Sequence, residues 1–178
     1  MTGRRLPGGP VERPRLVADA MLGRLARWLR IMGCDVLYDA HASDNELARL
    51  ARAEDRILLT RDVALARRLG GRALLLVDEH VDAQLRQVAA DLRLEAEATF
   101  SRCPVCNEAL EEVPRSWAWG YVPPYTFCTQ REFRLCPSCN RFYWRGTHWE
   151  HMRRIVAGLR RGGLWVREAE RKNSHKEA

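Results

Sequence analysis

Two Cys-x-x-Cys pairs constrain the C-terminal half of this chain more than any other feature. Cys103 and Cys106 flank Pro-Val, and Cys136 and Cys139 flank Pro-Ser. A two-residue gap lets both thiolates of one turn reach the same ion, so two such turns supply the ligands of a tetrahedral Zn²⁺ site. Residues 107–135 separate the pairs, a longer interval than the ~15–20 residues of a compact zinc finger. We therefore expect a β-ribbon or a loop between them.

The alternative is two unrelated cysteine pairs, or a pair of disulfides. Each pair brackets a Pro and is followed by Asn, at Asn107 and Asn140, as repeated zinc-binding turns would be. This repetition favours one zinc site. Because four sulfur ligands leave no position open for a catalytic water, the zinc is expected to be structural.

The charge of the chain is unevenly distributed. The whole sequence of 178 residues carries a formal charge of +7, of which residues 1–100 contribute +1 and residues 101–178 contribute +6. A basic, aromatic-rich segment beside a near-neutral one suits a polyanionic partner such as nucleic acid. The codon bias of a GC-rich genome would explain the preference for Arg over Lys, but it does not explain the asymmetry between the halves.

Cysteine usage and the N-terminus bear on the compartment. Cys34 and Cys128 have no obvious partners, and the other four cysteines have metal-ligand spacing, which is typical of a reducing compartment. Met1 to Pro14 lacks the apolar stretch of a signal peptide. No apolar run approaches the ~20 residues that a membrane span needs. We expect a cytoplasmic protein without a membrane partner.

Strand and helix patterns alternate through the first half of the chain. Strands are predicted at residues 15–19, 35–38, 56–60 and 73–77, and helices at residues 20–32, 44–54, 62–70 and 81–92. Such alternation predicts a parallel α/β sheet. Farther along, residues 117–127 are expected to form a loop or hairpin, and residues 148–159 a helix that Thr147 caps.

Acidic residues follow the ends of these predicted strands. They are Asp19, Asp39, Asp62, Asp78 and Glu79, with Asp44 and Glu46 on the turn after the second strand. In a parallel sheet these ends share one edge, where open α/β folds bind ligands. Clustered carboxylates repel one another unless a cation neutralises them, and their hard oxygens suit Mg²⁺ or Mn²⁺. The alternative for each acid is a helix cap or a solvated turn. We favour it for Asp39, Asp78, Glu79 and Asp82, and in part for Asp44 because the first turn of a helix favours an acid, but not for Asp19.

Other acidic α/β sites do not fit the residues present. A phospho-receiver domain needs a Lys late in the sheet, and residues 1–100 contain none. A haloacid-type phosphatase needs Asp-x-Asp after the first strand, whereas Ala20 and Met21 follow Asp19. A dinucleotide fold needs a Gly-rich turn there, and only Gly23 is present. A metal-dependent nuclease is the class that remains.

These segments together resemble the Mut-7 C-terminal ribonuclease family, a PIN-like nuclease fold fused to a zinc ribbon. The matching segments are residues 19–30 with Gly33 and Asp35, residues 44–46, 57–62, 102–107 and 136–144, and Gly146 to His148, where Thr147 replaces an expected Ser. The resemblance spans residues 15–159. It implies a Mg²⁺ or Mn²⁺ site for RNA cleavage at Asp19, Asp44 and Asp62, with Glu46 and Asp78 as further candidates for a fourth acid that the match leaves undefined.

The sequence thus predicts a flexible N-terminus at residues 1–14, a PIN-like α/β domain at 15–100, a zinc-ribbon module at 101–159 and a charged tail at 160–178. The expected activity is a metal-dependent ribonuclease. The candidate RNA-binding residues are Arg24, Arg27, Arg131, Arg134, Arg141 and Arg145. Arg24 and Arg27 could instead form a solvated helix face together with Arg30. Trp117, Trp119, Tyr121 or Trp144 could stack on bases, although Phe142, Trp144 and Trp149 are expected to pack around the zinc. The alternatives are a non-catalytic RNA-binding adaptor and a zinc-ribbon module that binds protein; protein partners are unknown.

Overall fold

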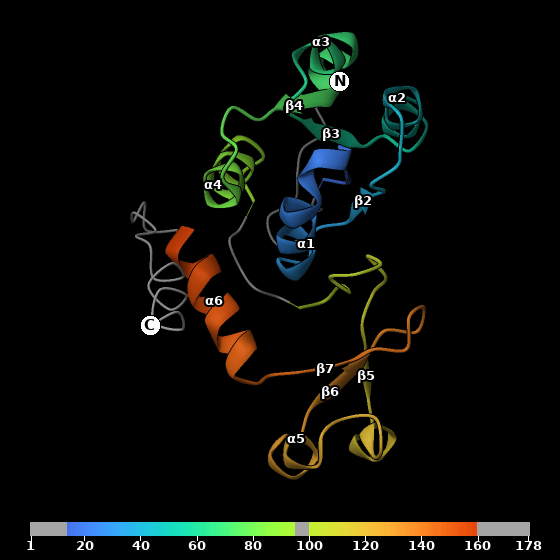
Figure 1. Cartoon of the computed structure of the whole chain (residues 1–178), viewed down its shortest axis with the longest axis vertical. Helices are drawn as coiled ribbons and strands as arrows, with labels where there is room; N and C mark the ends of the chain where they lie inside the picture. The colour runs from blue at the N-terminus through green and yellow to red at the C-terminus, as the bar shows by residue number, and fades with distance from the viewer. Residues whose placement is uncertain (1–13, 95–99, 160–178) are drawn as a thin grey trace, which may run out of the picture.

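The N-terminal part of the chain is built around a four-stranded parallel sheet. The computed structural model describes residues 14–94 and 100–159, so the expected charged tail and all of the expected N-terminal segment except Pro14 lie outside the described residues. The strands are β1 (Leu16–Ala18), β2 (Val36–Tyr38), β3 (Ile57–Thr60) and β4 (Ala73–Leu75), in the order β2-β1-β3-β4. The expected α/β class with a parallel sheet is confirmed (Figure 1).

Helices cover both faces of this sheet. Helices α1 (Gly23–Ile31) and α4 (Val81–Asp91) pack on one face, and α2 (Asp44–Ala53) and α3 (Val63–Leu69) on the other. Successive side chains of a strand point to opposite faces. In β1, Leu16 and Ala18 accordingly lie in the core under α1 and α4, and Val17 lies in the core under α2 and α3. The parallel sheet therefore has an apolar core on each of its two faces.

A tight turn follows β1. A 3-10 turn at Ala20–Leu22 precedes α1, so the predicted helix begins in a tighter form than expected. Tyr38 lies against this turn and donates a hydrogen bond of 2.9 Å from its hydroxyl to the carbonyl oxygen of Ala20. A Cβ atom at Gly23 would lie 2.6 Å from the Tyr38 hydroxyl oxygen, so a larger side chain at this position would displace the ring.

The C-terminal part contains a second, antiparallel sheet in the order β5-β6-β7. Its strands are β5 (Glu111–Val113), β6 (Phe133–Leu135) and β7 (Phe142–Trp144), which form the expected ribbon. Helix α6 (Thr147–Leu159) follows, and its Val156 joins the core under α1 and α4. The expected loop at 117–127 is wrong in part. A 3-10 turn at Arg115–Ala118 and the short helix α5 (Pro124–Thr129) form there, because a proline at the first helical position favours the start of a helix.

The two sheets are joined by polar contacts at the edge of β2. Arg30 is 5% exposed and donates hydrogen bonds to the carbonyl oxygens of Val36 (2.9 Å), Pro104 (3.3 Å) and Val105 (2.7 Å). The Asn107 side chain accepts from the Val36 N–H at 3.0 Å and donates to the Asp35 carboxylate at 2.7 Å. The first cysteine turn is thereby bound to the parallel sheet. Throughout residues 14–94 and 100–159, no helix is long and apolar enough to cross a membrane.

Candidate functional site

Four cysteines converge at the base of the ribbon. The sulfur atoms of Cys103, Cys106, Cys136 and Cys139 all lie within 4.8 Å of one another, with Sγ–Sγ distances of 3.7 Å between Cys103 and Cys139 and 3.4 Å between Cys106 and Cys136. A disulfide would require about 2.0 Å, whereas four 2.3 Å bonds to one tetrahedral zinc place the sulfurs about 3.8 Å apart. The cluster therefore fits a structural zinc, and it excludes the disulfide alternative.

The two cysteine turns have the same backbone geometry. In each turn the N–H of the Asn that follows the second cysteine donates to the carbonyl oxygen of the first, at 3.0 Å for Asn107 and 2.9 Å for Asn140. Both Asn residues have positive φ values, 72° and 55°. Asn tolerates this left-handed conformation better than most residues, which explains the repeated Asn in the sequence.

The thiols of the cluster differ in how readily they ionise. Burial opposes ionisation of Cys103, but the hydrogen bond from the Tyr143 hydroxyl (3.1 Å) and nearby backbone N–H groups lower its pKa to about 7. Burial raises the pKa of Cys136 to about 12. Without a metal the Cys136 thiol would thus be protonated at neutral pH, whereas a zinc ion deprotonates the thiols that coordinate it.

The second candidate site lies at the carboxyl edge of the parallel sheet. The chain leaves β1 toward β2 on one side and leaves β3 toward β4 on the other, so the connections after β1 and β3 diverge. Such a switch point opens the crevice in which open α/β sheets bind ligands. Asp19 directly follows β1, and Asp62 follows β3 by two residues. The topology therefore brings these two acids, which are distant in sequence, to the same edge of the sheet.

Asp19 is a buried carboxylate without a charged partner. It is only 6% exposed, and although it precedes the 3-10 turn at Ala20, its side chain makes no capping hydrogen bond. Thr60, at the end of β3, donates to its Oδ2 atom at 2.5 Å. No Arg, Lys or His of the described part of the chain forms an ion pair with it. The alternative of a helix cap therefore does not account for Asp19.

Thr60 also connects Asp19 to Asp62. Its Oγ1 atom accepts a hydrogen bond of 2.9 Å from the Asp62 N–H. The Asp62 side chain caps α3 by accepting from the Leu65 N–H at 2.8 Å through Oδ1. Thr60 was not predicted as a site residue. The sequence did hold a signal for it, because a hydroxyl residue stands at the end of a buried strand, two positions before an acid.

Asp44 is exposed at the first turn of α2, near the same edge. A capping box between Ser43 and Glu46 already satisfies the start of this helix, so the Asp44 carboxylate is not needed as a cap. The hydrogen bonds from Ser43 lower the pKa of Glu46 and engage its Oε2 atom. Of these two acids, Asp44 is the one whose carboxylate is available to a ligand.

The remaining acids at this edge make local contacts. Asp39 accepts a hydrogen bond from the N–H of His41, and Asp82 pairs with Arg86 along α4. The hydrogen bonds from the backbone N–H and the ring of His80 lower the pKa of Asp78. Within the described ranges, one group of three or more His, Cys, Asp or Glu residues could hold a metal ion. It is the four cysteines, whose donor atoms all lie within 4.8 Å of one another. The carboxylates of the sheet edge do not form such a group in the described part of the chain.

The arginines of α1 divide into two kinds. Arg24 and Arg27 are exposed, in keeping with either a solvated face or a phosphate-binding role. Arg30 was grouped with them in the sequence, but it is buried against the first cysteine turn. Its role is to join the two sheets.

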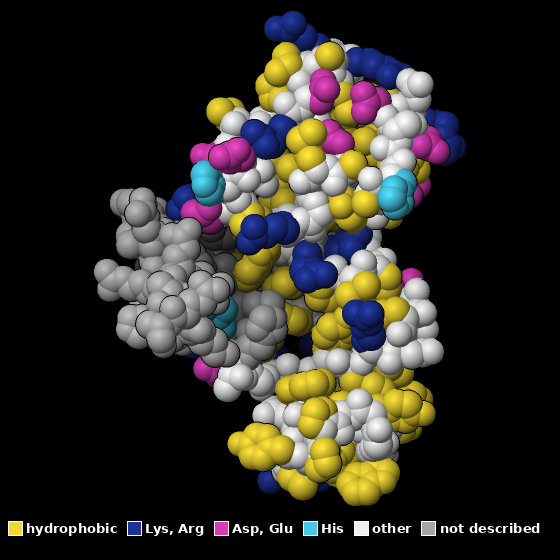
Figure 2. All heavy atoms as spheres, viewed as in Figure 1, with side chains coloured by type: hydrophobic (Ala, Val, Ile, Leu, Met, Phe, Trp, Pro, Cys, Tyr) yellow, Lys and Arg dark blue, Asp and Glu magenta, His cyan; other side chains and the backbone are white. Residues whose placement is uncertain are grey.

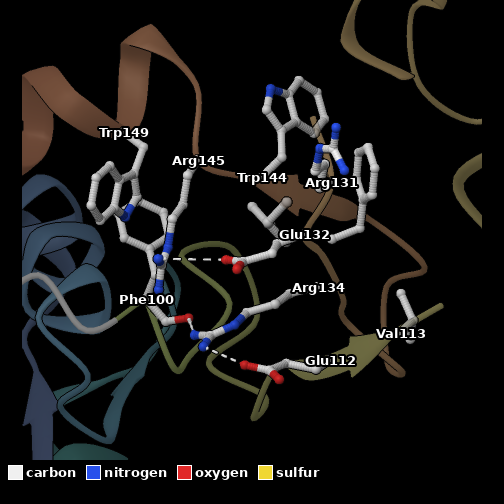
Figure 3. Close-up of a pocket in the computed structure, with 11 residues that line it drawn as sticks. Phe100, Glu112, Val113, Arg131, Glu132, Arg134, Trp144, Arg145 and Trp149 are labelled. Atoms are coloured by element: carbon white, nitrogen blue, oxygen red, sulfur yellow. Dashed lines mark hydrogen bonds and ion pairs between the residues drawn. The ribbon is translucent and has the colours of Figure 1, made fainter. Parts of the chain in front are cut away.

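Three of the four candidate arginines of the C-terminal part line one hollow of about 350 Å³, which we call the arginine–tryptophan pocket (Figure 3). Its lining includes Phe100, Glu112, Arg131, Glu132, Arg134, Trp144, Arg145 and Trp149. Arg134 is fixed by a hydrogen bond of 2.6 Å to the carbonyl oxygen of Phe100 and an ion pair of 2.9 Å with Glu112. Arg141 is exposed beside the second cysteine turn and does not line the pocket.

The aromatic residues of the C-terminal part occupy three environments. Phe142 and Trp144 pack against the ribbon core, which includes none of the four cysteines, whereas Trp149 packs with Ile31 and Phe100 at the junction with α1. Trp117, Trp119, Tyr121 and Tyr125 are 57–79% exposed. Hydrophobic side chains gather at the end of the ribbon where α5 lies (Figure 2). We call Trp117, Trp119, Tyr121 and Tyr125 the aromatic surface. The first three of these residues line a second hollow, of about 570 Å³.

Comparison with known proteins adds an independent finding. A family model described as "Mut7-C RNAse domain" matches residues 14–156. A human protein named "Exonuclease mut-7 homolog" is 35% identical over 109 residues, which cover 57% of this chain and 12% of the human protein. The chain thus spans a small part of that relative's length. No solved structure matches. Both descriptions point to a nuclease.

Proposed function

The chain belongs to the Mut7-C RNAse domain family, and from that premise we propose that it is a ribonuclease that uses Mg²⁺ or Mn²⁺ to hydrolyse RNA phosphodiester bonds. The observation that carries the proposal is the Asp19 carboxylate, which is buried at the switch point of the sheet without a cation partner among the described residues. Burying a carboxylate in this way is costly unless a cation neutralises it. The structure of the sheet edge is therefore explained best by a ligand that is positively charged.

Asp19, Asp44 and Asp62 are the residues that would hold the divalent ion. Their donor atoms are hard carboxylate oxygens, which Mg²⁺ and Mn²⁺ prefer. Glu46 and Asp78 are engaged in local hydrogen bonds, so we do not assign them to the ion. When bound, the ion supplies an activated water and stabilises the charge that develops on the phosphodiester.

The protein's own residues supply positioning. Thr60 orients the Asp19 carboxylate and fixes the backbone of Asp62. Exposed Arg24 and Arg27 on the adjoining helix α1 are suited to binding the phosphates of the RNA strand. Charge favours a role in RNA binding for the C-terminal part, since residues 101–178 carry a formal charge of +6.

We further propose that residues 15–100 and 101–159 are two structural units, because the parallel sheet lies before the division and the antiparallel ribbon after it. The four clustered cysteines are spaced as metal ligands and not as disulfides. That state fits a reducing compartment, and we propose the cytoplasm.

The proposal is tested by incubating purified, zinc-loaded protein with single-stranded and structured RNA, with Mg²⁺, Mn²⁺ or neither ion added. Cleavage should require the added ion, and Asp19→Asn should lower its rate by at least about a hundredfold, as expected when a metal-ligand charge is lost. A melting temperature at or above that of wild type would show that the variant is folded. If folded wild-type protein binds RNA but cleaves none with either ion, the chain is a non-catalytic adaptor.

A further inference from the structure

The arginine–tryptophan pocket combines flat aromatic rings with guanidinium groups. It lies between the β-ribbon and the first turns of α6, and Figure 3 shows Arg145 and Glu132 directed toward each other across it. We propose that this pocket binds one nucleotide of a single-stranded RNA, with the base against Trp144 and the phosphate at Arg131 and Arg145. The inference rests on the proposed ribonuclease function and names a binding subsite for its substrate, away from the acidic edge.

The size and lining of the pocket suit a nucleotide. Its volume of about 350 Å³ falls at the lower end of the range of about 300–1,000 Å³ that ligand pockets occupy. Proteins that bind single-stranded RNA stack unpaired bases on aromatic side chains beside a positively charged path for the backbone. Both kinds of group are present here in one hollow.

The charges of the pocket leave room for an anion. Three arginines face two glutamates among the lining residues. Arg134 is fully engaged with the protein. Arg131 forms no ion pair with any residue that the structure describes, so its guanidinium is available to a phosphate.

Arg145 is held only weakly. Its ion pair with Glu132 is 3.5 Å long, and the two side chains are 60% and 76% exposed. Exposed pairs of this kind contribute little to stability, so Arg145 can exchange Glu132 for a phosphate at small cost. Its guanidinium also lies over the ring of Trp149, 5.4 Å from the centroid, as does that of Arg153. Because guanidinium groups already lie over this ring, Trp144 is the aromatic residue of the pocket that would carry the base.

The aromatic surface is a poorer match for RNA. The residues that line its hollow include no charged side chain. The neighbouring Arg115 is engaged with Phe127, over whose ring it lies at 4.3 Å and to whose carbonyl oxygen it donates at 2.6 Å. Charge complementarity therefore favours the arginine–tryptophan pocket for a polyanion.

The test measures RNA affinity in full-length, zinc-loaded protein carrying Asp19→Asn to prevent cleavage. The probe is a fluorescein-labelled single-stranded 12-mer of uridine, followed by anisotropy at several salt concentrations. Combining Arg131→Ala and Arg145→Ala should weaken binding at least about tenfold and lower the salt slope by about 0.7, because the two arginines are proposed to neutralise one phosphate of a single strand. The matched control is Arg154→Ala. Arg154 is an exposed arginine of α6 outside the pocket, and because a distant charge acts only weakly on binding, its loss should change the affinity less than about twofold. Losses of equal size for Arg131→Ala and Arg154→Ala would overturn the inference in favour of diffuse charge.

A second measurement locates the base. The same oligonucleotide with 5-iodouridine is cross-linked by light, and the attached residue is identified by mass spectrometry. Attachment at Trp144 is expected; attachment confined to Trp117, Trp119 or Tyr121 would assign RNA to the aromatic surface and overturn the inference. If the wild-type protein cleaves RNA, and the pocket variants in the Asp19→Asn background bind RNA with unchanged affinity, only the pocket is refuted. Failure of folded wild-type protein both to bind and to cleave RNA refutes the proposed function as well.

Discussion

The hydroxyl of Thr60 donates a hydrogen bond of 2.5 Å to the carboxylate of Asp19 and accepts one of 2.9 Å from the N–H of Asp62. The Thr60 side chain is completely buried. It thus sets the position of two acids that follow two different strands. Residues that orient metal-binding groups in this way typically contribute 10–100-fold to metal affinity or activity.

Replacing Thr60 separates the hydroxyl from the shape of the side chain. Thr60→Val keeps the volume but removes both hydrogen bonds, so activity should fall about 10–100-fold and the Mn²⁺ concentration needed for half-maximal activity should rise. Thr60→Ser retains the hydroxyl and should recover most of the activity. The metal titration is the deciding measurement, since a purely structural role for Thr60 would lower activity without changing the metal requirement.

Asp44 and Glu46 form a matched pair two residues apart on one helix. Asp44→Asn should abolish most of the activity and leave stability nearly unchanged, because the capping box does not use its carboxylate. Glu46→Gln should retain activity, since an amide oxygen can still accept the Ser43 hydrogen bonds, at a stability cost of about 1 kcal/mol or less. Steady-state cleavage rates and urea unfolding of both variants check this; greater loss of activity in Glu46→Gln would exchange the two roles.

Zinc content is predicted to be one ion per chain. Cys136→Ser removes one of the four ligands and should release the metal and unfold the ribbon, because structural zinc supplies much of the folding free energy of a small module. Elemental analysis and near-ultraviolet circular dichroism report the two effects. Wild-type protein that is folded and carefully purified, yet holds less than about half an equivalent of zinc, would contradict a single structural site.

Arg30 and Arg27 lie three residues apart on α1 and should differ sharply in their effect on stability. Arg30→Ala leaves three carbonyl oxygens without their donor and should lower the free energy of unfolding by about 2–4 kcal/mol. Arg27→Ala changes an exposed residue and should cost no more than about 0.5 kcal/mol. Denaturant unfolding of both variants at saturating zinc measures the difference, and equal costs would show that the Arg30 contacts contribute nothing.

The sequence predicted what depends on local pattern. The alternation of apolar strands and amphipathic helices located all four parallel strands to within about two residues, the usual uncertainty of element ends, and the Cys-x-x-Cys spacing identified the four-sulfur cluster. It did not predict the partners of Arg30 and Asn107, because these contacts join positions more than seventy residues apart. A helix pattern placed Arg30 on a solvated face, and only the docked cysteine turn makes that position buried.

Helical structure at residues 115–129 was missed for a related reason. The segment is rich in Trp, Tyr and Pro, which have low helix propensity as a group, and this favoured a loop. The short helix α5 is stabilised by Pro124 at its first turn and by packing of Phe127 against the ribbon core. The acids at the sheet edge were located by strand order alone, whereas their coupling through Thr60 required the side-chain geometry.

The contacts of Val36 have a consequence for solubility. β2 is an edge strand of the parallel sheet, and the unpaired N–H and C=O groups of an edge strand invite pairing with a strand of another molecule. At Val36 both groups are occupied, the N–H by Asn107 and the C=O by Arg30. Since Asn107 is held in place by the cysteine turn, the zinc-binding turn also serves as a cover that keeps this edge from nucleating aggregation.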